Sequence, residues 1–244
     1  MADIRNSAPV TGDILKNDGI AASAARRRKL LTAVYFLLIS AVMIGLCSRC
    51  SPLYPFNNWN DANCFFTTGK AMFSGKVVYR DIYEQKGILL YFLYGLCYLV
   101  SNKTFLGVYI LEVLCLTGFL ALAYDSALLF LRRRTALILM PIAAAVLCGS
   151  YSFYYGGSVE ELELALVYLP ICCMLKSYFK NGDCIPSPRV IFVLGASAAC
   201  LLWSKFTLLG IYIGYVVFTA VLLIKRRDWK RLGSAAGMFV CGAA

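Results

Sequence analysis

The residues best suited to chemistry lie in a polar segment between positions 49 and 87, which separates two apolar runs. The candidate side chains there are Asp61, Tyr79, Arg80, Glu84 and Lys86. Cations neutralise a phosphate group, and a carboxylate can take a proton from an attacking hydroxyl. This combination suits a lipid-linked phosphate held at a membrane surface. The alternative is structural: Arg80, Asp81 and Glu84 form an ion-pair cluster that only orders the segment.

Two further candidates, Glu160 and Lys205, lie near the ends of later apolar runs. Ser158 followed three residues on by Glu161 predicts a capping box, which explains acidic residues at a helix start without any site. Glu160 and Glu163 are spaced i and i+3, so they share a helix face that can point at the polar segment. Lys205 either binds a phosphate or extends its amine to the lipid headgroups.

Several kinds of site are excluded or disfavoured by residue type. The chain has no histidine, which excludes an imidazole base and most catalytic zinc sites. Most of the 11 cysteines lie within apolar runs, where they pack as small hydrophobic residues; Cys47 and Cys50 form a CxxC that can be oxidised but has no partner ligands for zinc. We predict no metal site, and a divalent metal is optional for the chemistry. Glu112 and Asp125 are too far apart on one helix to form a pair, and Asp125 is expected to pair with the arginines at 132–134.

The elements that must position these residues are transmembrane helices. Apolar residues make up 60% of the 244 positions and charged residues 15%, too little polar surface for a soluble globule of this size. The predicted fold is therefore all-α, a polytopic transmembrane helix bundle whose long first outer loop contains short interfacial helices. The expected crossings are Leu30–Cys47, Phe105–Leu131, Ala136–Tyr151, Leu162–Phe179, Val190–Trp203, Leu208–Ile224 and a run beginning near Leu232.

Two apolar stretches are too short to cross. Ile88–Val100 would be only about 20 Å long as a helix, so we expect a partial or re-entrant helix. Ala62–Phe73 has the apolar spacing of a helix that lies in the membrane interface.

The charge distribution predicts the orientation. The net charge of +11 would suggest nucleic acid in a soluble protein, but the cations gather at the ends of the apolar runs, as topology signals do on the cytoplasmic side. We therefore expect no nucleic-acid partner. Residues 1–29 are predicted to be a cytoplasmic polar tail and residues 30–244 a transmembrane domain, with the outer loop at 49–87. The final apolar run has no polar residues after it, so a fragment of a longer protein is expected.

The outer loop also resembles a known family. Its pattern consists of Asp61, Gly69, Gly75 and Tyr79-Arg80-Asp81-Ile82-Tyr83-Glu84-Gln85-Lys86-Gly87 before an apolar helix. It is similar to the first outer loop of GT-C superfamily glycosyltransferases, especially bacterial proteins similar to protein O-mannosyltransferases and the lipid A aminoarabinose transferase. The likeness covers about residues 30 to 180.

The resemblance implies an enzyme of the bacterial inner membrane that moves a sugar from a polyprenyl-phosphate donor to an acceptor on the outer face. It implies that Asp61 lies at the active site and that Lys86 contacts the donor phosphate, and it favours an acidic group such as Glu160 after the later crossing. The chain departs from the family in having Asn60-Asp61 where two acids are common, and Lys86-Gly87-Ile88-Leu89 where a K-x-P-L start is common.

Three interpretations remain. The first is a glycosyltransferase with Asp61 as base and with Lys86 and Arg80 on the phosphate. The second is a transporter or flippase for an anionic lipid or sugar, which needs the cations but no base, so that Asp61→Asn abolishes transfer but not transport. The third is a membrane subunit that serves assembly only. The sugar and the acceptor do not follow from the residues.

Overall fold

The computed structural model describes residues 10–153 and 155–244, with the side chains of 22–151, 153 and 155–244. This part of the chain is helical and holds no β-strand, which confirms the all-α prediction. The helices are α1 (Val10–Cys47), α2 (Asn60–Phe73), α3 (Ile88–Val100), α4 (Leu106–Ala127), α5 (Arg133–Cys148), η1 (Tyr151–Phe153), α6 (Val159–Asn181), α7 (Pro188–Lys205), η2 (Phe206–Leu209), α8 (Gly210–Lys225) and α9 (Trp229–Ala243).

Four helical segments of the described chain are long and apolar enough to cross a membrane, as expected of an integral membrane protein. They are Ala22–Cys47, Leu106–Ala127, Val159–Asn181 and Pro188–Lys225, the last containing α7, η2 and α8. Large apolar side chains on the helices face outward, with Leu38 60%, Val146 70% and Ile213 63% exposed. Exposing these apolar side chains to water would be unfavourable, whereas lipid chains solvate them.

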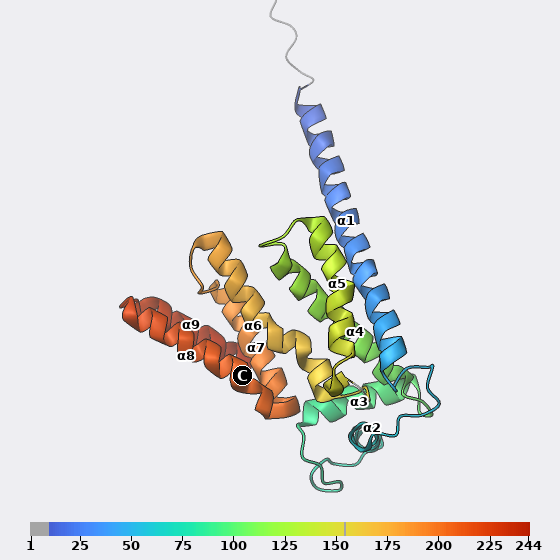
Figure 1. Ribbon diagram of the computed structural model, residues 1–244. Helices are drawn as coiled ribbons and strands as arrows, with labels where there is room; N and C mark the ends of the chain where they lie inside the picture. Colours follow the sequence, from blue (N-terminus) through green and yellow to red (C-terminus); the bar gives the residue numbers. More distant parts are fainter. Residues whose placement is uncertain (1–9, 154) are drawn as a thin grey trace, which may run out of the picture.

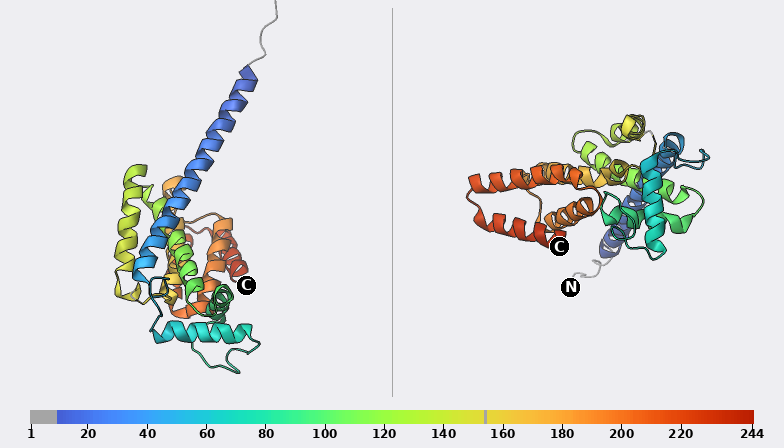
Figure 2. Two further views of the ribbon diagram at one scale, coloured as in Figure 1. Left: turned by 90° about the vertical axis from the view of Figure 1, so that its right-hand side faces the viewer. Right: turned by 90° about the horizontal axis from the view of Figure 1, so that it is seen from below.

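The chain runs back and forth between two ends of the bundle (Figure 1). α1 descends to the lower end, α4 returns to the upper end, α5 descends, α6 rises and α7 descends again. α8 and α9 form a slanting antiparallel pair beside them, seen from below in Figure 2. The helices follow one another in the predicted order, but α5 and α9, which the sequence predicted as crossings, are not among the four candidate spans of the described chain.

α2 and α3 lie across the lower end of the bundle instead of passing through it (Figures 1 and 2). They pack closely because glycines face each other: a Cβ on Gly69 would lie 2.6 Å from the nitrogen of Gly95. α3 has the predicted bounds and is too short to be a candidate span. The predicted interfacial helix is present as α2, two residues longer at its start.

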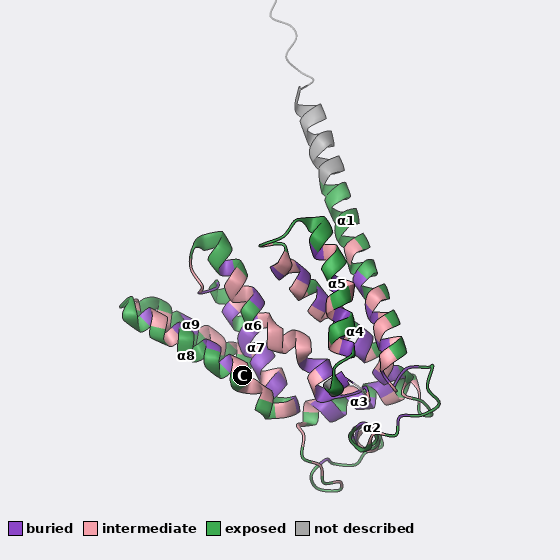
Figure 3. Cartoon of the chain, in the orientation of Figure 1, coloured by how far each residue is buried: buried purple, intermediate pink, exposed green. Residues whose placement is uncertain are grey.

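One cluster of buried residues lies at the lower end, where α2, α3, α4 and α6 meet (Figure 3). Phe65 of α2, Tyr91 and Tyr94 of α3, Val108 of α4 and Leu162 of α6 pack together there. A second cluster joins α1, α4 and α5 farther up. The transverse helices are therefore part of the bundle, and they fix the position of the loop that leads into α3.

Glycines also bring α7 and α9 together. A Cβ on Gly195 would lie 2.1 Å from the carbonyl oxygen of Phe239, and one on Gly242 would lie 2.0 Å from that of Phe192. Such contacts between backbones are typical of helix pairs in membranes, where small residues permit close van der Waals packing.

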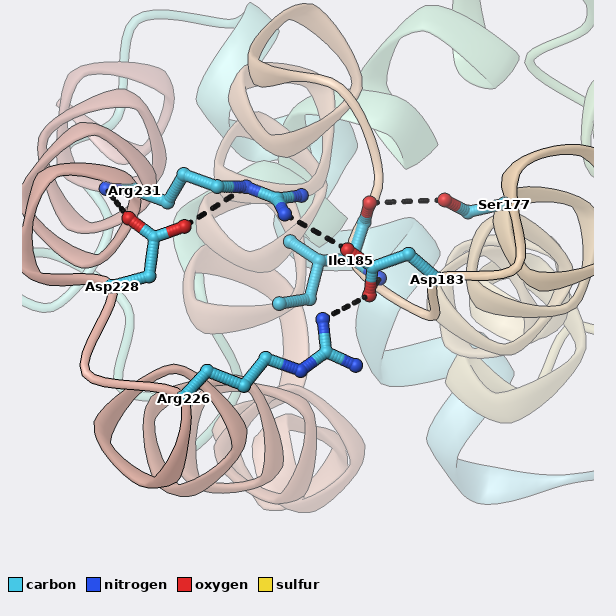
Figure 4. A network of polar contacts seen from close by, with 6 residues as sticks. All are labelled: Ser177, Asp183, Ile185, Arg226, Asp228 and Arg231. Atoms are coloured by element: carbon cyan, nitrogen blue, oxygen red, sulfur yellow. Dashed lines mark hydrogen bonds and ion pairs between the residues drawn. The ribbon is translucent and has the colours of Figure 1, made fainter.

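At the upper end, Asp183 ties two helix connections together (Figure 4). Its carboxylate accepts from Arg226 at 3.0 Å and from Arg231 at 2.9 Å. Burial by itself would raise the pKa of this carboxyl, but the Ile185 amide and the two guanidinium groups more than offset that effect and hold it below its usual value.

Two details differ from the sequence predictions. Residues 1–9 of the predicted polar tail lie outside the described part, and from Val10 onward the tail is helical and continuous with α1. Its alanines and basic residues are good helix formers, so the helix begins well before the apolar run. Asp125 pairs with Lys176 at 2.5 Å instead of the arginines at 132–134, because α6 packs along α4 and places that lysine opposite it.

Candidate functional site

The end of the outer loop docks on the end of α7. The amide of Gly87 donates to the carbonyl oxygen of Ser204 at 2.8 Å. A Cβ at position 87 would lie 1.8 Å from the carbonyl oxygen of Trp203, so only glycine permits this approach. The contact joins segments that are well over a hundred residues apart in the sequence.

Two tyrosines hold the backbone of Lys86 beside this contact. The hydroxyl of Tyr79 donates to the Lys86 carbonyl at 2.5 Å, and the Lys86 amide donates to the hydroxyl of Tyr91 at 2.8 Å. Tyr79 adopts a φ of 70°, a strained conformation for a residue with a side chain, and its amide donates to the carbonyl of Ile82. The position of Lys86 is thus fixed by its own backbone, which leaves its ammonium free to bind.

Glu160 and Lys205 meet at the same place. Their side chains form an ion pair in which Lys205 is 23% exposed and Glu160 41% exposed. Lys86 is close enough to Glu160 to interact with its charge. Because Gly87 bonds to Ser204, the neighbouring residues Lys86 and Lys205 bring two cations from distant segments into the region of one carboxylate at the lower end of the bundle.

Glu163 lies on the buried side of this cluster. Its side chain is 4% exposed, and neither carboxylate oxygen has a hydrogen-bond partner among the described residues. Ser204 lies nearby but donates its hydroxyl to the carbonyl of Cys200 at 2.8 Å. The shared face predicted for Glu160 and Glu163 thus points at the end of α7.

Asp61 lies on the first turn of α2 and is exposed. Within the described chain, no hydrogen bond or ion pair joins it to the Glu160 cluster. The start of α2 is nevertheless anchored near that cluster, because Trp59 stacks on Tyr155 with centroids 6.0 Å apart and Ala62 packs next to Gly157, three residues before Glu160. Asp61 and Glu160 therefore lie at the same end of the bundle.

Arg80 and Glu84 take part in ordering the loop. Arg80 is 71% exposed and bonds to Asp81 at 2.9 Å, which in turn accepts from the Val77 amide at 2.8 Å. The hydrogen bond from Arg80, aided by that amide, lowers the pKa of Asp81. Glu84 accepts from the Gln85 amide at 2.8 Å. These contacts fit the structural alternative for Arg80 and Asp81.

Beneath the loop lies a buried network that the sequence reasoning missed. The carboxylate of Glu112 accepts from the hydroxyl of Ser48 at 2.9 Å and from the amide of Gly157 at 2.5 Å. The hydroxyl of Tyr94 donates to the carbonyl of Gly157, also at 2.5 Å. The network thereby joins α1, α3, α4 and the start of α6.

Gly156 and Gly157 are required for this network. Both have positive φ, 73° and 74°, and a Cβ on Gly156 would lie 1.8 Å from the Ser48 hydroxyl. The following helix start is as predicted: Ser158 and Glu161 form a capping box. The two adjacent glycines directly before the capping box were the signal in the sequence that could have predicted this close approach of the backbone to a buried side chain.

Cys47 and Cys50 are both free, and burial raises the pKa of the Cys50 thiol well above its usual value, with the nearby Glu112 carboxylate adding to the effect. The thiol is therefore held in its unreactive protonated form. Among the described residues, no group of three or more acidic or cysteine side chains is arranged to hold a metal ion.

No protein-family model matches the chain, and no curated protein or solved structure matches it either. Function must therefore be argued from the site.

Proposed function

We propose that this protein is a membrane glycosyltransferase that uses a sugar carried on a polyprenyl phosphate. The observation that carries the proposal is the hydrogen bond from Gly87 to Ser204, which brings the backbone of Lys86 beside that of Lys205, the ion-pair partner of Glu160. Two ammonium groups at one end of a set of apolar helices suit a phosphate whose lipid chain lies along the bundle.

The ion pair between Glu160 and Lys205 suggests how the site is used. A bound donor phosphate offers Lys205 a stronger anionic partner, which releases the Glu160 carboxylate. The acceptor hydroxyl then attacks the anomeric carbon, its proton passes to a carboxylate, and the bond to the phosphate oxygen breaks so that polyprenyl phosphate leaves. Lys86 and Lys205 stabilise the charge that develops on the leaving group.

We assign the proton-accepting role to Asp61 and the phosphate to Lys86 and Lys205. Asp61 is exposed and unpaired within the described chain, as a base awaiting an acceptor should be, whereas Glu160 already has a cationic partner. Arg80 is left in its loop-ordering pair with Asp81. A divalent metal remains optional, because phosphate is a good leaving group once its charge is neutralised.

Binding of the bare lipid phosphate tests the first part of the proposal. Polyprenyl phosphate should bind the protein in detergent far better than uncharged polyprenol of the same length, and Lys86→Gln or Lys205→Gln should weaken binding about tenfold or more. Lys103→Gln is the matched control, because Lys103 is exposed in the loop that joins the transverse α3 to α4. Equal binding of phosphate and alcohol would overturn the proposal.

Sugar transfer tests the second part. With polyprenyl-phosphate mannose and polyprenyl-phosphate aminoarabinose as donors, Asp61→Asn should lower kcat about 100-fold or more while the donor still binds. Retained movement of the labelled lipid across vesicles by Asp61→Asn, without transfer in the wild type, would favour the transporter instead.

A further inference from the structure

The opposite end of the bundle holds a second cluster of cations that the proposed transferase does not use. A hollow of about 540 Å³ lies between α1, α4 and the start of α5. Its volume is within the range of sites for small ligands. Three cations line it: Arg28, Lys29 and Arg133.

These cations have no acidic partner in the described part of the chain. Arg133 reaches the hydroxyl of Thr32 at 3.3 Å, and that hydroxyl also donates to the carbonyl of Arg28 at 2.9 Å. The one carboxylate in the lining, Asp125, is paired with Lys176. The hollow therefore carries an excess of about three positive charges that no described side chain neutralises.

The rest of the lining is apolar. Phe36 and Tyr124 form a buried floor, with their rings in edge contact at 5.3 Å, and Ala33, Ala121 and Leu128 form an exposed wall. A small soluble anion would gain no binding energy from contact with this apolar wall. A ligand with a charged head and a hydrocarbon chain would contact both parts.

We propose that this hollow binds an anionic phospholipid, with the phosphate among Arg28, Lys29 and Arg133 and an acyl chain along Ala33, Ala121 and Leu128. Basic pockets between membrane helices suit such headgroups because each cation near the surface attracts anionic lipid. The lipid would hold α1 against α4 and α5 at the end far from the outer loop. The site is separate from the proposed donor site, so either can fail without the other.

The test compares short-chain phosphatidylglycerol, phosphatidylcholine of equal chain length and glycerol phosphate, each added to the detergent-purified full chain. Native mass spectrometry counts the bound molecules. We expect one phosphatidylglycerol to bind in preference to phosphatidylcholine, and glycerol phosphate to bind at least tenfold more weakly. Equal binding of the two phospholipids, or of glycerol phosphate and phosphatidylglycerol, would overturn the proposal.

Two variants with the same loss of charge distinguish lipid binding in this hollow from a general attraction of anionic lipid to a basic surface. The triple variant Arg28→Gln, Lys29→Gln, Arg133→Gln should lose about 100-fold in affinity for phosphatidylglycerol. The control triple Arg26→Gln, Arg27→Gln, Arg134→Gln removes the same charge from the same segments outside the hollow and should stay within threefold of wild type. Similar losses in both triples would refute the assignment.

The triple variant could lose lipid binding simply because it misfolds. A variant that keeps every charge therefore provides a second test. Ala121→Trp fills the apolar wall at an exposed position, so the fold is retained while the acyl chain is displaced. Loss of phosphatidylglycerol binding in this variant supports the site, and undiminished binding overturns it.

Discussion

Gly87→Ala tests the contact on which the proposed site depends. The backbone of Gly87, with φ −75° and ψ 155°, suits alanine, so the substitution adds no backbone strain. The whole effect comes from the new methyl group, which would lie 1.8 Å from the carbonyl oxygen of Trp203. Since carbon and oxygen atoms seldom approach closer than about 3 Å, the loop must move away by more than 1 Å, which breaks the hydrogen bond to Ser204.

The expected cost follows from these two losses. Overpacking costs about 1–3 kcal/mol, and a lost hydrogen bond about 0.5–1.5 kcal/mol. The local free energy of opening should therefore fall by roughly 1.5–4.5 kcal/mol, which raises the open population by a factor of about 10 to 2000.

Limited trypsin digestion measures this opening at Lys86, whose peptide bond is protected by the docked backbone. The cleavage rate follows the open population when opening and closing are fast. Cleavage after the exposed Arg80 serves as an internal reference, and a peptide of residues 79–93 corrects for the changed residue after the cleaved bond. Gly214→Ala is the matched control, because nothing lies within 4 Å of its added methyl. Cleavage of Gly87→Ala at Lys86 within twofold of wild type would show that the loop does not dock on α7.

Three further substitutions probe the rest of the fold. Glu112→Ala leaves the Gly157 amide and the Ser48 hydroxyl without this acceptor and should lower the unfolding free energy in mixed micelles by about 2–4 kcal/mol. Glu112→Gln should lower it less, because the amide oxygen still accepts a hydrogen bond. Equal losses of unfolding free energy in the two variants would contradict these hydrogen bonds. Asp183 has a depressed pKa, so its stabilisation is full above its unfolded pKa of about 3.9 and is lost as the pH falls through the folded value. Asp183→Asn should therefore flatten the fall in Tm as the pH drops from about 5 to about 2, and an unchanged slope would argue against the bridge. Gly242→Leu should separate α7 from α9 and lower Tm, whereas Gly233→Leu, with no atom within 4 Å of its added Cβ, serves as the control.

The elements were predictable because lipid enforces a simple rule. Each apolar run must form its own backbone hydrogen bonds, so run lengths nearly give the helices. α3 is the clearest case: 13 residues are too few to cross, and the helix lies across the end of the bundle. The capping box at Ser158 was predictable for a similar reason, since it depends on local spacing alone.

The candidate site was only partly predictable. The sequence identified Lys86, Glu160 and Lys205 as residues of the right type, but nothing local indicates that residue 87 pairs with residue 204. The role of Glu112 was missed because its partners are a hydroxyl and a backbone amide, which carry no charge signal. The pairing of Asp125 with Lys176 depended on which helix packs beside α4.

The link between Glu112 and Gly157 sets an order of events during synthesis. Gly157 is made 45 residues after Glu112, a delay of about 2–9 s at ribosomal rates of roughly 5–20 residues per second. We therefore expect Glu112 to enter the membrane before Gly157 is available, with the earlier Ser48 hydroxyl as its hydrogen-bond donor. On this order of synthesis we expect a nascent stage in which α1 and α4 are inserted but the hydrogen bond that joins α4 to the start of α6 has not yet formed.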